Sequence, residues 1–216
     1  MKTKHIVAAF LPLLAFSVAV FGQRTITEKE FWGEIVASSE AGGKILPRKE
    51  TLITEELENG KLVETSREVA EYDAFGRSRV TTTNPFMGKG TTSVVITIGK
   101  FYYCREDKGR WKKSRQNCGS MSTMSSPPAL RSKFTSETIS EGGATLVLVS
   151  GEFVYSDVEG RNMEHLFEDK LWINPDKTIN RRIMTGSVIG TKEITSRRTE
   201  TYEYKVSIPK IVAPSK

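Results

Sequence analysis

The sequence offers one histidine, His165, around which a catalytic or metal site of a folded domain could form. The only other histidine, His5, lies in an apolar N-terminal segment. A metal site needs several converging ligands, and a hydrolase triad needs its serine in an elbow such as Gly-x-Ser-x-Gly, which the sequence lacks. We therefore interpret His165 as a partly buried strand residue with a satisfied side chain.

Other motifs that carry chemistry are incomplete. The serines of residues 120–126 lie in a run of small polar residues that is typical of a loop. Residues 88–91 (GKGT) resemble a phosphate-binding loop but lack its upstream glycine and its following helix. Carboxylates alternate along strands as on a solvated sheet face, and a glycosidase pair among them stays open because their separation cannot be read from sequence. The sequence predicts no enzyme, no catalytic residue, no cofactor and no metal.

Cys104 and Cys118 are the chain's two cysteines. They are too far apart for a Cys-x-x-Cys redox motif, and no second pair is present to complete a metal site. In an exported chain they predict a structural disulfide, which would close a loop of about 15 residues and contribute ~3 kcal/mol. The alternative, a redox switch, has no other support in the sequence.

Residues 1–22 have the pattern of a secretory signal peptide. Lys2 and Lys4 are followed by an apolar run from Ile6 to Phe21, and small residues then permit cleavage after Gly22. The alternative is an uncleaved membrane anchor, but this run is shorter than the ~20 residues that a spanning helix needs. We expect export to the periplasm.

The remaining chain, residues 23–216, is long enough for one substantial core, and we predict a single domain. The formal net charge of the full chain is +6. Basic and acidic residues alternate, as in Arg105-Glu106-Asp107-Lys108, rather than forming a block. This pattern favours a solvated surface over a nucleic-acid partner.

One helix is predicted after the signal. Thr27 and Glu30 have the spacing of a capping box. An apolar stripe follows, made of Phe31, Trp32, Ile35 and Val36. Residues 41–43 (AGG) are expected to end the helix, because glycine tolerates the left-handed conformation at a helix C-terminus.

From residue 48 onward the pattern is one of strands and turns. Asn59-Gly60 between two apolar runs is a strong hairpin signal, and residues 202–208 alternate strictly between apolar and polar. About ten strands joined mostly by short turns predict an up-and-down antiparallel sheet, which must curl at this length. The predicted fold is mainly β: a strongly curved antiparallel sheet covered by the N-terminal helix.

Several short motifs resemble the LolA/LolB-type lipoprotein-localisation carriers and their LppX-type relatives. They are the hairpins of residues 51–72, FGRSR (75–79), IGKFYY (98–103), GRW (109–111), LWI (171–173) with residues 174–181, and the tail of residues 202–209. The resemblance implies an incomplete barrel of about 11 strands, with helices plugging an apolar concave face that binds acyl chains. The cysteine pair and the single clear helix depart from this pattern.

The resulting hypothesis is a periplasmic carrier of a lipid or another hydrophobic ligand. It would act as a monomer whose partners are a lipid or an acylated client and an outer-membrane or envelope protein. The alternative is a non-enzymatic envelope module that binds another protein and has a filled core. For each large apolar residue, the choice lies between ligand contact and core packing. The candidate cavity residues are Trp32, Ile96, Phe101, Tyr103, Trp111, Phe153, Tyr155, Phe167 and Trp172.

Overall fold

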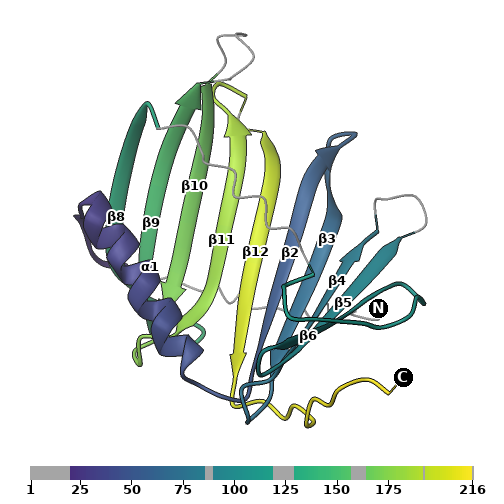
Figure 1. The fold of residues 1–216 in the computed structure, drawn as a ribbon. Helices are drawn as coiled ribbons and strands as arrows, with labels where there is room; N and C mark the ends of the chain where they lie inside the picture. The colour runs from purple at the N-terminus through teal and green to yellow at the C-terminus, as the bar shows by residue number, and fades with distance from the viewer. Residues whose placement is uncertain (1–19, 86–89, 119–128, 157–163, 192, 216) are drawn as a thin grey trace, which may run out of the picture.

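A computed structural model gives the fold and describes residues 20–85, 90–118, 129–156, 164–191 and 193–215 (Figure 1). One antiparallel sheet of twelve strands dominates it, with strands forming 62% of the described residues. The strand order is β1-β8-β9-β10-β11-β12-β2-β3-β4-β5-β6-β7. The strands are β1 (Val20–Thr25), β2 (Arg48–Glu58), β3 (Lys61–Tyr72), β4 (Ser78–Asn84), β5 (Thr91–Ile98), β6 (Phe101–Glu106), β7 (Lys112–Ser114), β8 (Arg131–Glu141), β9 (Ala144–Ser156), β10 (Glu164–Ile173), β11 (Ile179–Val188) and β12 (Ile194–Tyr204).

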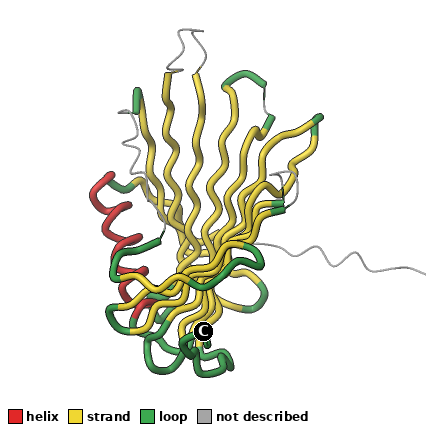
Figure 2. Tube along the Cα trace, turned by 45° about the vertical axis from the view of Figure 1, so that its right-hand side comes forward, coloured by secondary structure: helices red, strands yellow, loops and turns green. Residues whose placement is uncertain are grey.

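The sheet is not closed into a barrel, and β1 and β7 form its two edges. The predicted mainly β class, with a curved sheet and a covering helix, is confirmed. One strand escaped sequence reasoning: β1, which overlaps the predicted signal peptide. Figure 2 shows the strands fanning apart at one end, as expected of the twist between neighbouring strands.

Some sequence predictions fall outside the described residues. Most of the signal peptide of residues 1–22 does so, as do the serines of residues 120–126 and two residues of the GKGT stretch. Cleavage after Gly22 stays a prediction, and it would leave Arg24 and Thr25 of β1 paired with β8.

Local signals explain the central hairpins. Asn59 and Gly60 both have positive φ, 51° and 76°, as the tight turn between β2 and β3 requires. The next turn is organised by Asp73, whose carboxylate accepts hydrogen bonds from the backbone N–H groups of Phe75 and Arg77. The sequence predicted the first of these turns correctly because it depends on two adjacent residues.

The helix α1 (Glu28–Gly43) starts as predicted. The Thr27 hydroxyl accepts from the Glu30 backbone N–H at 3.2 Å, and the Glu30 carboxylate accepts from the Thr27 backbone N–H at 2.7 Å. These reciprocal bonds satisfy two donors that a helix start leaves unpaired. No helix among the described residues is long and apolar enough to cross a bilayer.

The helix end and the helix's buried face differ from prediction. The C-cap is Lys44 in right-handed conformation, with φ of −81°, so glycine in a left-handed conformation does not end this helix. Gly42 is needed for packing instead, since a Cβ there would lie 2.6 Å from the Tyr204 hydroxyl. The buried positions are Phe31, Ser38 and Gly42, whereas Trp32 and Val36 of the predicted stripe are exposed.

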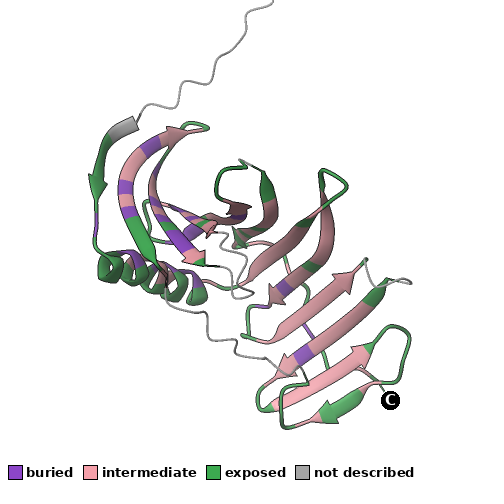
Figure 3. Ribbon diagram, turned by 90° about the horizontal axis from the view of Figure 1, so that it is seen from above, coloured by how far each residue is buried: buried purple, intermediate pink, exposed green. Residues whose placement is uncertain are grey.

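The main core lies between α1 and the strands β8 to β11. Phe31, Val149 and Leu171 are fully buried there, and Ile173 and Ile179 complete the same cluster. Seen from above, most buried residues lie on the strands nearest the helix, and the far half of the sheet is mainly intermediate or exposed (Figure 3). The single helix therefore organises one half of the sheet.

The pairing of β12 with β2 joins the two halves of the sheet. Nine residue pairs, from Ser196 with Glu56 to Tyr204 with Arg48, form this ladder. Across it, the guanidinium of Arg197 donates to both carboxylate oxygens of Glu55, at 2.5 and 2.8 Å. Hydrogen bonding to Arg197 lowers the pKa of Glu55 below its usual value. The last strand of the chain thus sits at the middle of the sheet.

Candidate functional site

The face of the sheet that carries α1, here called the helix-side face, holds the candidate site. Residues directly opposite each other in an antiparallel ladder share a face, so the register assigns each side chain. Phe153 of β9 pairs with Phe167 of β10, which in turn pairs with Gly186 of β11. Phe31 of α1 contacts Phe153 and therefore fixes this as the helix side.

Six aromatic side chains meet on this face and are called the aromatic row: Phe31, Trp32, Phe134, Phe153, Tyr155 and Phe167. At its inner end, Phe31 lies 5.0 Å from Phe134 between ring centroids. The row continues from Phe153 to Tyr155 at 6.5 Å, and from Tyr155 to Phe167 at 5.5 Å. Such spacings are typical of favourable aromatic pairs.

The row changes from buried to exposed along its length. Phe31 is 0% exposed and Phe153 is 9% exposed, whereas Trp32 and Phe167 are 41% and 42% exposed. The inner rings therefore belong to the core. The outer rings present apolar surface to solvent on the same continuous strip.

Two glycines make room for these rings. A Cβ on Gly151 would lie 2.8 Å from the Phe31 ring, and a Cβ on Gly186 would lie 3.1 Å from the Phe167 ring. Real Cβ atoms essentially never approach another atom as closely as the first of these distances. Gly151 lets Phe31 sit directly on the sheet, and Gly186 lets Phe167 lie flat across β11.

A polar cavity of about 260 Å³ adjoins the C-terminal end of α1 on the same face. It is called the tyrosine basin and is lined by Ser39, Gly42, Gly43, Arg48, Glu50, Tyr72, Ile179, Tyr202 and Tyr204. Arg48 is held from three sides. Its guanidinium lies 3.7 Å from the Tyr72 ring centroid, and it donates to Glu50 at 2.8 Å and to the Gly43 carbonyl at 3.0 Å.

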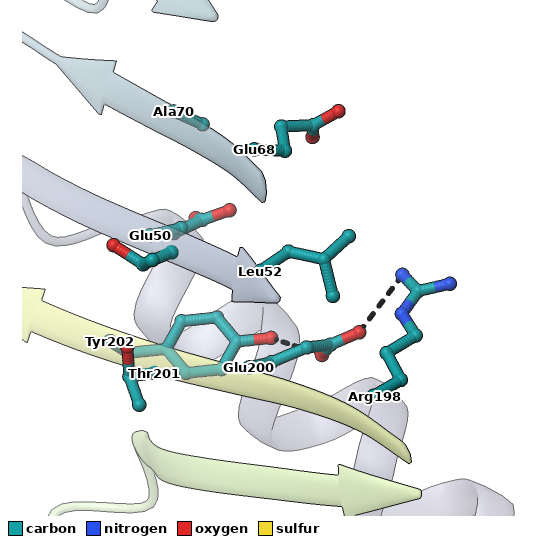
Figure 4. Close-up of a pocket in the computed structure, with 9 residues that line it drawn as sticks. Glu50, Leu52, Glu68, Ala70, Arg198, Glu200, Thr201 and Tyr202 are labelled. Atoms are coloured by element: carbon teal, nitrogen blue, oxygen red, sulfur yellow. Dashed lines mark hydrogen bonds and ion pairs between the residues drawn. The ribbon is translucent and has the colours of Figure 1, made fainter. Parts of the chain in front are cut away.

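A smaller hollow of about 120 Å³ continues from the basin over β12, β2 and β3 (Figure 4). Its labelled side chains include Leu52, Glu68 and Arg198. Here the Tyr202 hydroxyl donates to Glu200 at 2.8 Å, and Arg198 pairs with the same carboxylate at 3.0 Å. The floor of the helix-side face is therefore polar near β2, unlike the apolar concave face that the family resemblance implies.

The tyrosine hydroxyls of this region remain protonated near neutral pH. Burial, followed by the nearby negative charge of Glu50, raises the pKa of Tyr204 to about 12. Burial and the charge of Glu200 raise the pKa of Tyr202 well above its usual value. Tyr202 already donates its hydroxyl proton to Glu200, whereas Tyr204 can act as a neutral hydrogen-bond donor to a ligand.

An ion pair separates the aromatic row from the tyrosine basin. Arg182 donates to both oxygens of Asp169, at 2.9 and 2.6 Å, and Asp169 is 6% exposed. Burial opposes the charge on Arg182, but hydrogen bonding to Asp169 and the negative charges of Asp169 and Glu200 together outweigh this effect and raise the pKa of Arg182. Removing one partner of a buried charge pair strongly destabilises the folded protein, because the other charge is left buried and unpaired.

The nine candidate cavity residues divide between the two faces. Trp32, Phe153, Tyr155 and Phe167 come together in the aromatic row. The other strand candidates lie on the opposite face. The register shows this, because Trp172 pairs with Arg181 and the pairing continues strand by strand across the sheet to Val94 of β5. This second group consists of Ile96, Phe101, Tyr103 and Trp172.

Two of the separated tryptophans have their own partners. Trp172 packs in a second cluster with Ile139 and Leu146, under the guanidinium of Arg181 at 4.2 Å. Trp111 lies between β6 and β7, where the Arg105 guanidinium is 4.7 Å from its ring. The nine residues therefore do not line one cavity together, and a ligand-binding role for any of them stays a prediction.

Sequence reasoning overlooked several residues of the helix-side face. Phe31 was assigned to the helix stripe, but its contact with Phe134 could not be foreseen. Tyr202 and Tyr204 were recognised only as alternating strand residues. Their spacing of two residues indicated that they share a face of the sheet. It did not indicate that Arg48 of β2 and Tyr72 of β3 lie on the same face beside them.

No metal or redox centre is evident in the part of the chain that the structure describes. It contains no group of three or more His, Cys, Asp or Glu side chains that could hold a metal ion. His165 lies in β10 opposite Tyr155 and Val188 and is half-buried, as interpreted from the sequence. Cys104 and Cys118 form the predicted disulfide, with Cα atoms 6.3 Å apart.

Comparison with known proteins yields similarity of fold. No family model and no curated protein sequence matches the chain. It is similar to the lipoprotein LppX of Mycobacterium tuberculosis, with 9% identity, a TM-score of 0.43 and coverage of 84% of this chain and 98% of that one. It is also similar to LprF from Mycobacterium bovis, with 12% identity, a TM-score of 0.41 and coverage of 85% of this chain and 97% of that one. A third similar structure is a LolA superfamily protein from Nitrosomonas europaea, with 12% identity, a TM-score of 0.35 and coverage of 85% of this chain and 96% of that one. Each of these three likenesses spans most of this chain and has a TM-score below 0.5.

Proposed function

We propose that this chain is an exported, non-enzymatic binding protein or carrier for an amphipathic lipid-like ligand. The observation that carries the proposal is the aromatic row, which runs from the core to half-exposed rings on the same face as the tyrosine basin. An apolar strip beside a polar cavity fits a molecule with an apolar chain and a polar head.

Size determines how such a ligand would lie. The tyrosine basin, at about 260 Å³, is slightly below the ~300 Å³ at which ligand pockets usually begin. A long chain would not fit there, so the basin would take the polar head and the chain would lie along the row. Each methylene that leaves water contributes about 0.8 kcal/mol.

The polar head would meet a specific set of groups. The Tyr204 hydroxyl is a protonated donor, and the Glu50 side chain, an acceptor, is about one-third exposed. The Tyr202 hydroxyl already donates to Glu200. Arg48 is already bound by Glu50, Gly43 and Tyr72. The basin therefore favours an uncharged, hydroxyl-rich head over an anionic one.

A second candidate function is a protein-binding module of the cell envelope. The observation that favours it is the filled space beneath α1, where Phe31, Val149 and Leu171 are fully buried. In that case, Trp32 and Phe167 would contact a protein rather than a lipid.

Native mass spectrometry of gently extracted protein distinguishes the two candidates. The carrier proposal predicts a discrete added mass in the range of a lipid, which disappears after delipidation and returns when lipid extract is added. Protein of bare mass, with no uptake from the extract, would contradict the carrier and favour the module.

A further inference from the structure

Positive charge gathers at the β6–β7 end of the sheet. Residues 100–118 contain seven basic and two acidic residues, a formal charge of +5, whereas the whole chain carries +6. We call this surface the basic edge: Lys100, Arg105, Lys108, Arg110, Lys112, Lys113 and Arg115, with Phe101, Tyr103 and Trp111.

The charges of the basic edge are largely free to face solvent. All of its basic residues except Arg105 are exposed. Of the two acidic residues, Asp107 accepts a hydrogen bond from the backbone N–H of Thr92 at 2.7 Å, so part of its carboxylate is used within the fold. The alternating signs seen in the sequence therefore conceal a surface of one dominant sign.

Aromatic rings are interleaved with these charges. The Lys113 ammonium lies 4.0 Å from the Phe101 ring centroid and 5.6 Å from that of Tyr103. The guanidinium of Arg105 covers Trp111 at 4.7 Å. Register holds this arrangement in place, because Tyr103 pairs with Lys113 and the disulfide ties Cys118 back to β6.

Protection of the sheet edge explains only part of this surface. Lysine on an edge strand discourages pairing with another chain, and β7 carries two lysines in three residues. That role does not call for Lys100, Lys108, Arg110 or Arg115, which lie outside β7, nor for three aromatic residues among the charges.

We propose that the basic edge docks the protein on the surface of an anionic lipid bilayer. Each Lys or Arg near such a surface is worth about fivefold in affinity, and Trp and Tyr favour the headgroup region. A single-stranded nucleic acid would instead need bare aromatic faces for base stacking. Here Lys113 and Arg105 occupy faces of Phe101 and Trp111, so the geometry favours the bilayer.

Docking at this edge does not depend on the proposed ligand binding. Phe101 and Tyr103 lie on the face opposite the aromatic row, and the row lies on α1 and β8 to β10, away from β7 in the strand order. The protein could therefore contact a bilayer through one end while the helix-side face remains open.

Co-sedimentation with vesicles tests the docking proposal. We expect wild-type protein to bind vesicles of phosphatidylglycerol and phosphatidylcholine in equal parts, and not vesicles of phosphatidylcholine alone. Raising the salt to about 1 M, where the Debye length is ~3 Å, should abolish binding. The double variant Lys112→Glu with Lys113→Glu should bind at least about tenfold more weakly.

A second variant and a matched control complete the test. Lys108→Glu with Arg110→Glu reverses two exposed charges outside the strands and should weaken binding similarly without disturbing strand pairing. Lys29→Glu with Lys61→Glu makes the same change of charge on α1 and β3 and should bind as wild type does. The proposal is overturned by equal binding to neutral vesicles, by equal losses in the control, or by binding of a single-stranded oligonucleotide without binding of anionic vesicles.

Discussion

At the scale of single residues, the best-defined contact is that between Gly151 and Phe31. A Cβ at Gly151 would lie 2.8 Å from the ring of a phenylalanine that is 0% exposed and packed between Phe134 and Phe153. The Phe31 ring has no space to move aside, because the rings of Phe134 and Phe153 lie against it. A single methyl group here would therefore disturb the packing of α1 on the sheet.

We predict that Gly151→Ala lowers the free energy of unfolding by about 1–3 kcal/mol, as overpacked cores usually do. Urea denaturation followed by circular dichroism measures this change. The matched control is Gly33→Ala, on the exposed side of α1 with open space around it, which should stabilise by about 0.5–1 kcal/mol. Equal midpoints for wild type and Gly151→Ala would show that Phe31 is not seated as described.

Asp73 makes stability depend on pH. Burial raises its pKa, but hydrogen bonds from Ile211, Arg77 and Phe75 outweigh this effect and lower the value from 3.8 to about 2. A carboxylate with a lowered folded-state pKa contributes stability above its unfolded pKa, and this contribution is lost as the pH falls through the folded value. The sensitive window therefore lies between about pH 4 and pH 2.

We expect wild-type stability to fall through that window and Asp73→Asn to show a shallower decline. Thermal unfolding at several pH values measures both. Because the carboxylate accepts from the Ile211 backbone N–H at 2.9 Å, it also anchors the C-terminal tail. Parallel curves for the two proteins between pH 4 and pH 2 would contradict this role of Asp73.

At the scale of elements, sequence reasoning succeeded where the cause is local. Thr27 and Glu30 specify the start of α1 within four residues, and Asn59-Gly60 specifies the β2–β3 turn by itself. The end of α1 was assigned for the wrong reason, since Gly42 serves the close approach of Tyr204, which comes from a strand 160 residues later. A contact between residues so far apart in the sequence cannot be predicted from the residues that surround either of them.

Face assignment could not be predicted for the same reason. Phe101 and Phe167 are both aromatic strand residues, and a shift of register by one residue exchanges their faces. The aromatic row and the basic edge therefore became separable only once the order of the twelve strands was known. The charge of residues 100–118 can be counted in the sequence, but their place at the β6–β7 edge of the sheet cannot.

The disulfide should stabilise the fold by restricting the unfolded chain, by an amount that grows with the logarithm of the length of the loop it closes. Its partners are 14 residues apart, and the chain-entropy relation for such a loop gives about 3 kcal/mol. We predict that the double variant Cys104→Ala with Cys118→Ala loses stability of this order in urea denaturation. Reduction of the wild type should give a similar loss and leave the double variant unchanged; an effect of reduction on the variant would rule out the disulfide as the cause.

At the scale of the whole molecule, the sheet combines two unlike halves. The half formed by β8 to β11 is packed under α1, whereas the half formed by β3 to β7 has few buried residues and ends in the basic edge. The β12–β2 ladder joins them, with the polar floor of the tyrosine basin at the join. This division places the proposed ligand surface and the proposed docking surface on different parts of one sheet.

Titration of delipidated protein with a fluorescent fatty acid, compared between two matched variants, tests the central claim most directly. Phe167→Ser removes a half-exposed ring from the aromatic row, and Phe101→Ser removes a ring from the opposite face. We predict saturable binding by wild type, an affinity about tenfold lower for Phe167→Ser, and no change for Phe101→Ser. Absence of saturable binding, or equal losses in the two variants, would contradict a ligand site on the helix-side face.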